Sequence, residues 1–530
     1  MKLYKYLLFA AVAMGSVSCT DSFNEINTNH HEATDGMLET DNLRIGAFFS
    51  QMQQRVILFK DGTGKAESSD YQVAQGLTAD LYSGYIGATG TWRSGRTTAA
   101  YYMVDGWYNQ MFSRGFSEVM TAWQKVHKAC EEMNMPVASA VADIVKVEAM
   151  HRVTDMYGPI PYTTFGSGTI GSAYDTQEAV YNKFFEELDN AINVLTPYAE
   201  TGASALSDYD FVYGGDVANW VRFANTLRLR LAMRVVYANP SLAQTEAEKS
   251  TSNSIGVIET AAQRAELQHG KLNYFHPYYD IAYTFNDGEA RMNASMDSYM
   301  NGYNDPRLSK YFKPAASDGK YHGVRLGVQN MAPSKYAGSN VSNLNVDNSS
   351  TPIVWMTAAE SYFLRAEGAL RGWNMGGTAK EFYEAGIKMS FDENSAGSAD
   401  NYINDNTSKP ADYEDPTGDG NSKSAMSQIT IKWEDGNFEK SLERIITQKW
   451  IALYPDGPEG WAEFRRTGYP KLFPVVTNYS SSVVSSDTQI RRCPFPTSEY
   501  NTNPDGVKTG VAALVGADNI GTKLWWDKKN

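Results

Sequence analysis

Apolar residues recur every three or four positions over several long segments of the chain. That spacing places them on one face of a helix. It predicts helices over residues 105–135, 136–157, 176–195, 217–237 and 438–453. The segment 136–157 is apolar on most sides, so we expect its helix to lie deep in the protein. Asp175, with Glu178 three residues later, is expected to cap the third of these helices.

Two further helices are predicted from the residues at their N-termini. Thr357 is followed by Glu360 and Thr378 by Glu381, and both pairs have the spacing of a capping box. The residues 371–377 between them include three glycines and are typical of a loop. We therefore expect a helical hairpin here. Such pairs stack well into tetratricopeptide-like arrays, although no strict repeat of about 34 residues is visible.

Long stretches of a different composition separate the helical segments. They are rich in glycine, tyrosine, asparagine and other polar residues, and they cover mainly 76–104, 270–355, 395–435 and 470–530. Loops of this length are uncommon in a compact domain unless they carry a function. Short strands are expected within 429–433 and 482–484. The predicted fold is therefore mainly α. A tetratricopeptide-like scaffold of helix pairs lies mainly within 105–267 and 356–468, and long irregular loops with few short strands form a ligand face.

The N-terminus has the pattern of a secretory signal peptide. Lys2 and Lys5 precede a short apolar run, residues 7–14, and small residues lead from it to Cys19. The run is too short to span a membrane. A cysteine at the cleavage point resembles a bacterial lipoprotein signal, and ordinary secretion with an incidental cysteine is the alternative. The predicted organisation is a signal peptide over 1–18, a lipidated Cys19 with a flexible tether over 19–36, and a single domain over 37–530.

Composition and charge narrow the class of partner. The 530 residues include 47 Lys and Arg against 61 Asp and Glu, which gives a net charge of −14 without a long basic run. A nucleic-acid partner is therefore not expected. Three cysteines exclude a disulfide scaffold. The 33 tyrosines suit a half-wet surface better than a dry core, because each ring carries a polar tip.

No motif for catalysis or for a bound cofactor stands in the context that it needs, since the literal G-x-G-x-x-G at 166–171 follows prolines and not a buried strand. There is no H-E-x-x-H and no G-x-S-x-G, and the seven histidines are scattered. Residues 415–421 resemble the start of a calcium loop, but Met426 stands where the bidentate glutamate belongs. No cofactor or metal is therefore expected. Paired carboxylates for glycoside hydrolysis are a matter of spatial separation, so a lipid-anchored glycoside hydrolase stays open as an alternative.

Several segments, taken in order, resemble one family. They are residues 23–29, the N-D-P-R-L turn at 304–308, the helix at 359–367, the long signature at 448–470 and the segment 491–504. Together, and behind a lipoprotein signal, they are similar to the SusD/RagB family of outer-membrane nutrient-binding lipoproteins, in its SusD-like branch. The resemblance runs from residue 19 to about residue 504.

This resemblance implies both an architecture and a role. Such proteins are mainly helical, with four tetratricopeptide-like helix pairs as a scaffold and long loops as the ligand face. They are tethered by lipid to the outer membrane and exposed on the cell surface of Bacteroidota. They cap a TonB-dependent, SusC-like transporter, which the helical scaffold would face, and deliver glycans or peptides to it without catalytic residues. We expect a glycan ligand here, with a peptide as the alternative.

Candidate ligand residues follow from the chemistry of sugars. A sugar ring offers C–H faces to an aromatic plane and hydroxyl groups to polar side chains. Two aromatic-rich loops, 81–93 and 274–286, have this combination. The candidates are Tyr82, Tyr85, Trp92 and Arg93 in the first and Tyr278, Tyr279, Tyr283 and Asn286 in the second. Structural packing is the alternative for each of them.

The family signature itself is expected to be structural. Its large aromatic residues, Trp450, Trp461 and Tyr469, should pack helices together. Arg465 and Arg466 should pair with carboxylates. The arginines of the helix at 217–237 should meet acidic neighbours or act as last-turn charges.

Overall fold

The computed structural model describes residues 43–529 apart from short gaps at 62–69, 91, 167–170, 268–271, 285–287, 329–332, 337–338 and 349. The predicted signal peptide, Cys19 and the tether therefore lie outside the described residues. Within them, no helix is both long and apolar enough to cross a membrane.

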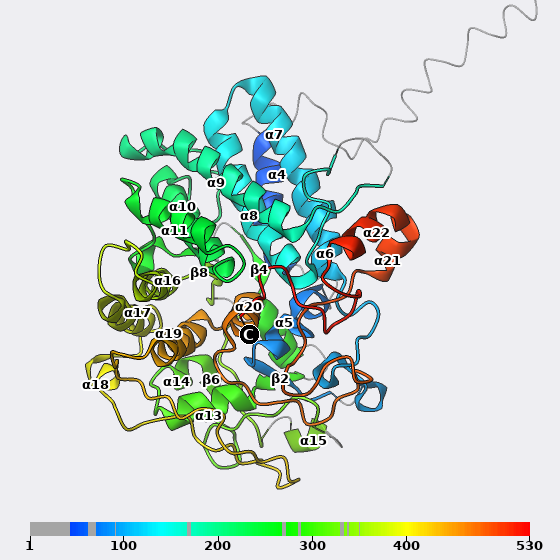
Figure 1. Ribbon diagram of the computed structural model, residues 1–530, viewed down its shortest axis with the longest axis vertical. Coiled ribbons are helices and arrows are strands. Elements are labelled where there is room, and N and C mark those ends of the chain that lie inside the picture. The colour runs from blue at the N-terminus through cyan, green and yellow to red at the C-terminus, as the bar shows by residue number, and fades with distance from the viewer. Residues whose placement is uncertain are drawn as a thin grey trace, which may run out of the picture.

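Eight of the described helices pack as four pairs. The pairs are α4 (Leu43–Gln54) with α7 (Thr121–Met133), α8 (Pro136–Tyr157) with α9 (Gln177–Glu200), α10 (Val217–Arg234) with α11 (Pro240–Ser252), and α16 (Ala358–Leu370) with α17 (Ala379–Glu393). Contacts of α7 with α8, of α9 with α10 and of α10 with α16 join the pairs into one array. In Figure 1 this array fills the upper part and the left side of the molecule. A helix-pair scaffold was predicted, and the structure confirms it.

The remaining longer helices lie beside the array. α19 (Phe438–Leu453) packs on α16, and α20 (Gly457–Thr467) packs on α8 and on the short α5 (Ala79–Tyr82). The other described α-helices are α6 (Gln110–Arg114), α12 (Pro277–Tyr279), α13 (Ala294–Gly302), α14 (Leu308–Tyr311), α15 (Pro333–Tyr336), α18 (Asp400–Ile403), α21 (Thr497–Thr502) and α22 (Pro504–Ala513). Most of these helices are three to six residues long, and most lie within the long loops between the main helices. We call that part of the molecule the loop-rich half.

Short antiparallel strand pairs hold the loop-rich half together. They are β1 (Lys60–Asp61) with β4 (Tyr274–Phe275), β2 (Ile86–Ala88) with β5 (Ala290–Met292), β3 (Ala265–Leu267) with β8 (Ile353–Met356), and β6 (Phe312–Lys313) with β7 (Asn343–Leu344). The first three pairs join segments that are far apart in the sequence. The strands expected within 429–433 and 482–484 do not form, because both segments are irregular chain.

The apolar pattern predicts several helix limits well, whereas the predicted capping residues are less accurate. The helices predicted over 136–157 and 438–453 form with those limits, and every residue of α8 from Ile144 to Tyr157 is buried. The helix predicted from residue 105 begins at Gln110, and a π-helical turn interrupts it before α7. The capping box at Thr378 is complete.

Two of the expected caps need correction. Thr176, not Asp175, caps α9, because its side chain accepts the Ala179 backbone N–H. The Asp175 carboxylate instead accepts the backbone N–H groups of Tyr162 and Thr163. Thr357 caps α16, but Glu360 does not complete the box, since its carboxylate binds Arg230.

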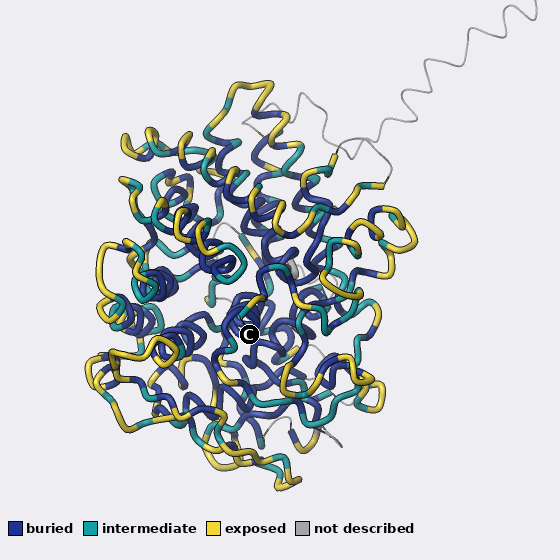
Figure 2. The backbone as a smooth tube through the Cα atoms, in the orientation of Figure 1, coloured by how far each residue is buried: buried dark blue, intermediate teal, exposed yellow. Residues whose placement is uncertain are grey.

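Most buried apolar side chains of the described residues form one continuous core. Figure 2 shows that it runs through the helical array and into the loop-rich half, with exposed residues mainly on peripheral loops and outer helix faces. A small second cluster contains Val324, Val328, Tyr336 and Val341.

Candidate ligand-binding site

The structure brings the two aromatic loops of the sequence prediction side by side. Strand β2, within the first loop, pairs with β5, which follows the second. The Thr89 N–H then donates to the Glu289 carbonyl, and the Glu289 N–H donates to the Ile281 carbonyl. Loops that begin about 200 positions apart in the chain therefore adjoin, as one ligand face would require.

Tyr82 and Tyr85 do not belong to the accessible part of this face. Both are essentially fully buried. The Tyr85 hydroxyl donates to the Trp450 carbonyl at 2.6 Å, and the two rings stack. The Tyr82 hydroxyl donates to the Thr98 carbonyl. These two candidates pack the loop onto α19 and α20, so no ligand reaches them in this structure.

Trp92 and Arg93 lie at the surface. Trp92 is half-buried, and its ring meets Trp107 edge to face, with 5.6 Å between centroids and 77° between planes. Arg93 is exposed and has a left-handed backbone, with φ of 52°. Trp107 was missed because it lies just beyond the predicted loop, in the aromatic run 101–108. That run of aromatic residues around Gly106 was the available signal.

Tyr279 and Tyr283 form part of a second half-buried aromatic group. Phe275 contacts Tyr279 edge to face at 5.6 Å, and Tyr279 lies 5.0 Å from Tyr283. The Lys313 ammonium lies 4.8 Å from the centre of the Tyr283 ring. The Tyr283 hydroxyl donates to the Leu344 carbonyl, which fixes the ring against β7. Asn286 lies outside the described residues. Lys313 is an additional member that the sequence prediction did not include. Phe275 lies within the predicted loop but was not among its candidates.

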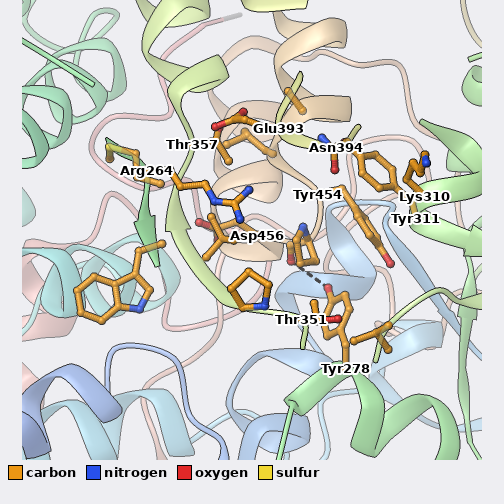
Figure 3. A pocket seen from close by; sticks show the side chains of 18 of the residues that line it. Arg264, Tyr278, Lys310, Tyr311, Thr351, Thr357, Glu393, Asn394, Tyr454 and Asp456 are labelled. Carbon is orange, nitrogen blue, oxygen red and sulfur yellow. Dashed lines mark hydrogen bonds between the residues drawn. The ribbon is translucent and has the colours of Figure 1, made fainter. Parts of the chain in front are cut away.

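Tyr278 points the other way, into a cavity of about 220 Å³ (Figure 3). Its hydroxyl donates to the Pro455 carbonyl at 2.9 Å, and the ring is buried. Tyr311 and Tyr454 form another wall, with their rings 4.6 Å apart at 30°. The cavity lies between β8, α17, the C-terminal end of α19 and the loop-rich half. Aromatic walls at this volume suit a single ring.

Polar groups face the same cavity. Glu393 accepts the backbone N–H groups of Ala358 and Ala359 at the start of α16, and burial raises the pKa of its carboxyl to about 7. Figure 3 places Glu393 and Asn394 on one side of the cavity and Tyr278 on the other. The Trp355 indole N–H, at another wall, is buried and meets no acceptor among the described residues. The cavity can thus hold one ring and hydrogen-bond its substituents.

A buried ionic network joins α8, α10, α16, α19 and α20, and one of its members, Glu360, also lines the cavity behind Tyr278. Burial opposes ionisation of Glu459, but Arg234 and Arg230 outweigh it and hold the pKa of Glu459 well below its usual range. Arg230 also pairs with Glu360 at 2.6 Å. The prediction that helix arginines meet acidic partners is confirmed for Arg230 and Arg234, while Arg222 donates to the Asn219 amide oxygen instead.

The two arginines of the family signature differ. Arg466 pairs with Glu367 and Glu463, each at 2.6 Å, as predicted. The same prediction is wrong for Arg465, which has no carboxylate within 4.0 Å in the part of the chain that the structure describes. Its guanidinium donates to backbone carbonyls of Trp461, Asp155 and Arg491.

In the loop that resembles a calcium site, the carboxylates of Asp415 and Asp419 contact donors of the protein itself. Asp415 accepts hydrogen bonds from Thr417, Asn421 and Tyr336. Asp419 forms an ion pair with Lys335 at 2.8 Å. Across the described ranges, no group of three or more His, Cys, Asp or Glu side chains is placed to hold a metal ion.

Four stacked helix pairs that carry a loop-rich face define a class of helix-repeat scaffold. A family model described as "Susd and RagB outer membrane lipoprotein" matches residues 25–527. The chain belongs to this SusD-like family of outer-membrane lipoproteins. None of the curated proteins compared with the chain matches it.

Solved structures of SusD homologues resemble this one closely. A chitin-binding SusD homologue from Flavobacterium johnsoniae is 41% identical, with a TM-score of 0.87, and the match covers 92% of this chain and 99% of that one. A SusD homologue from Bacteroides uniformis is 39% identical, with a TM-score of 0.86 and coverage of 92% and 100%. One from Bacteroides vulgatus is 37% identical, with a TM-score of 0.86 and coverage of 93% and 99%.

Proposed function

We propose that this protein is a non-enzymatic binding protein of the cell surface that captures a glycan and delivers it to a TonB-dependent, SusC-like transporter. The observation that carries the proposal is the pair of half-buried aromatic groups on adjoining loops, Trp92 with Trp107 and Tyr279 with Tyr283. All four side chains are half-buried, and the Lys313 ammonium lies over the Tyr283 ring. The C–H faces of sugars pack on such rings.

The class of glycan is suggested by a relative. The Flavobacterium johnsoniae protein binds chitin and shares 41% of its residues with this chain. We therefore propose a chitin-type saccharide, whose acetamido groups can accept and donate hydrogen bonds as well as pack. The cavity behind Tyr278 would take at most a single sugar unit of such a chain, because its volume is about 220 Å³.

The direct test is binding of chitin oligosaccharides to the purified mature chain by calorimetry. Trp92→Ala and Tyr283→Ala should each weaken binding by about 1–3 kcal/mol, because each removes an aromatic contact with a ring. Tyr198→Ala is the matched control, since Tyr198 is an exposed aromatic residue on α9, in the helical array. Circular dichroism should show all three variants folded.

Other outcomes of the same experiment decide between the alternatives. Binding of peptides but of no glycan would favour the peptide-binding role. Release of shortened products from a polysaccharide would favour a hydrolase. If chitin oligosaccharides bind wild type and both loop variants equally, the aromatic groups are not the site. Glu393→Gln then tests the cavity instead.

Delivery requires a surface that docks on the transporter. The helical array exposes Met133, Val194 and Tyr198, and a hollow of about 410 Å³ lies beside Tyr198 between the ends of α7, α8 and α9. Exposed apolar side chains next to a hollow suit a protein interface. Val194→Asp with Tyr198→Asp should abolish co-purification with the transporter while glycan binding stays unchanged. Retained co-purification would place the docking surface elsewhere.

A further inference from the structure

A larger cleft lies on the opposite side of α20 from the ionic network. Its volume is about 590 Å³, and it is formed by the last turns of α20, the segment 471–491 and the C-terminal residues 521–529. Phe464, Leu472 and Val483 give it an apolar lining. Val483 is among the most exposed large apolar residues described, at 44%.

Cations dominate the polar lining of this cleft. Five of its side chains are basic, Arg465, Lys471, Arg491, Lys523 and Lys529, and one is acidic, Asp487. Arg491 pairs with Asp527 and Lys529 with Glu439. No carboxylate lies within 4.0 Å of Lys471 or Lys523 in the described part of the chain, and both are exposed. In a protein with a net charge of −14, this is a local reversal of sign.

Arg465 is the unusual member of this set. It is 2% exposed, and its guanidinium lies 3.6 Å from the Trp461 ring centre. Its Nε and Nη1 groups donate to carbonyls, whereas no hydrogen bond from Nη2 is found among the described residues. Burial lowers the pKa of Arg465, yet a guanidinium stays charged near neutral pH. The carboxylates of Asp155 and Asp527 favour the charged form without an ion pair, so Nη2 keeps donors that an anion from outside can accept.

We propose that this cleft is a second binding site, which takes a sugar unit carrying an oxyanion, either carboxylate or sulfate. Arg465, Lys471 and Lys523 would contact the anion, and Phe464 and Leu472 would pack on the ring. Charge-assisted bonds from a planar guanidinium suit such oxygens. The cleft volume admits a disaccharide-sized group. The inference rests on the proposed glycan binding and adds a second specificity, for acidic sugar units, at a cleft separate from the neutral glycan site.

The test is calorimetry of the mature chain with three probes: a chondroitin sulfate tetrasaccharide, an oligogalacturonate and neutral chitotetraose. Acidic probes should bind in about 0.1 M salt and weaken at least several-fold in about 1 M salt, where charges are screened. The double variant Lys471→Gln, Lys523→Gln should weaken acidic probes about tenfold. It should leave chitotetraose binding unchanged, so failure of this site and failure of the neutral glycan site are distinguishable.

Two controls complete the design. Lys471→Arg with Lys523→Arg keeps both charges and should retain acidic binding. Lys508→Gln, an exposed lysine on α22, should have no effect. The proposal is overturned if neither acidic probe binds, if the double variant binds them like wild type, or if inorganic phosphate and sulfate alone compete as well as the sugars do. The last result would define a simple anion site.

Discussion

The two sides of helix α20 handle buried charge in opposite ways. Toward the helical array, Arg466 meets two carboxylates and is fully buried. Toward the C-terminal loops, its neighbour Arg465 is buried just as deeply but meets only carbonyls and aromatic rings. The arginines are adjacent in sequence and share one helix turn. The difference therefore lies entirely in what the fold places opposite each of them.

A buried acid beside α20, Asp80, shows why it matters whether a buried charge has an oppositely charged partner. Asp80 packs against the first turn of α20 and has no cationic partner among the described residues. Burial raises the pKa of Asp80 to about 7, so this carboxyl can take up a proton and become neutral. A guanidinium does not lose its proton near neutral pH, so a buried arginine stays charged. Asp80 can therefore do without a cation, whereas Arg465 keeps its charge and relies on carbonyls, aromatic rings and carboxylates that lie beyond ion-pair distance.

The largest expected effect on stability comes from removing a carboxylate from the ionic network on the side of α20 that faces the helical array. Glu459→Gln leaves Arg234 and Lys449 with one fewer carboxylate in a site that water does not reach. Removing one partner of a buried ion pair costs about 3–5 kcal/mol. We expect a loss of that size in the free energy of unfolding, measured by urea denaturation. A loss below about 1 kcal/mol would mean that the network relaxes or admits water.

Acid should lower the free energy of unfolding by protonating the carboxylates that pair with Arg466. Burial opposes ionisation of Glu367 and Glu463, but Arg466 outweighs it and lowers the pKa of each carboxyl to about 2. Because both values lie below those of the unfolded chain, their stabilising contribution is complete above about pH 4.5 and is lost as pH falls toward 2. The loss should be on the order of 3 kcal/mol for each carboxyl. Unfolding followed by fluorescence over this range measures it, and a flat profile would contradict the pairing.

Asp80 should show the opposite dependence. Its raised pKa means that the folded state holds a proton which the unfolded state has released between about pH 4 and 7. The free energy of unfolding should therefore fall as pH rises through this window. Asp80→Asn should remove about 1–3 kcal/mol of that dependence, measured as the difference between unfolding at about pH 5 and about pH 8. An unchanged dependence would assign the titration to another group.

The smallest expected effect sharpens the comparison. Lys471→Gln and Lys523→Gln should change the free energy of unfolding by less than about 0.5 kcal/mol, because both side chains are exposed and lack a carboxylate partner in the described ranges. Thermal unfolding of the double variant measures this. A clear gain in stability would show that the two lysines repel each other or Arg465 at a cost to the fold. A clear loss would give them a structural role.

The helices could be predicted from sequence because their apolar spacing is a local property. α8 and α19 form with the expected limits for this reason. The accessible ligand residues could not be predicted in the same way. Tyr85 is buried because its hydroxyl meets Trp450, 365 positions away. Trp92, four positions after the end of β2, stays half-buried. Composition and loop length indicate a ligand face, but only the pairing of distant segments decides which rings stay exposed.

The pairing of distant segments also predicts an order of assembly. The helix pairs from α7 to α11 contact their neighbours in sequence, so they can form while the rest of the chain is still unstructured. The aromatic loops close only when β2 meets β5 and when Tyr85 meets Trp450. Long-range closures of this kind are slow and come late in folding. Folding kinetics should therefore show early helical signal and late burial of Tyr85 and Trp450, so that a ligand surface exists only once nearly the whole chain is in place.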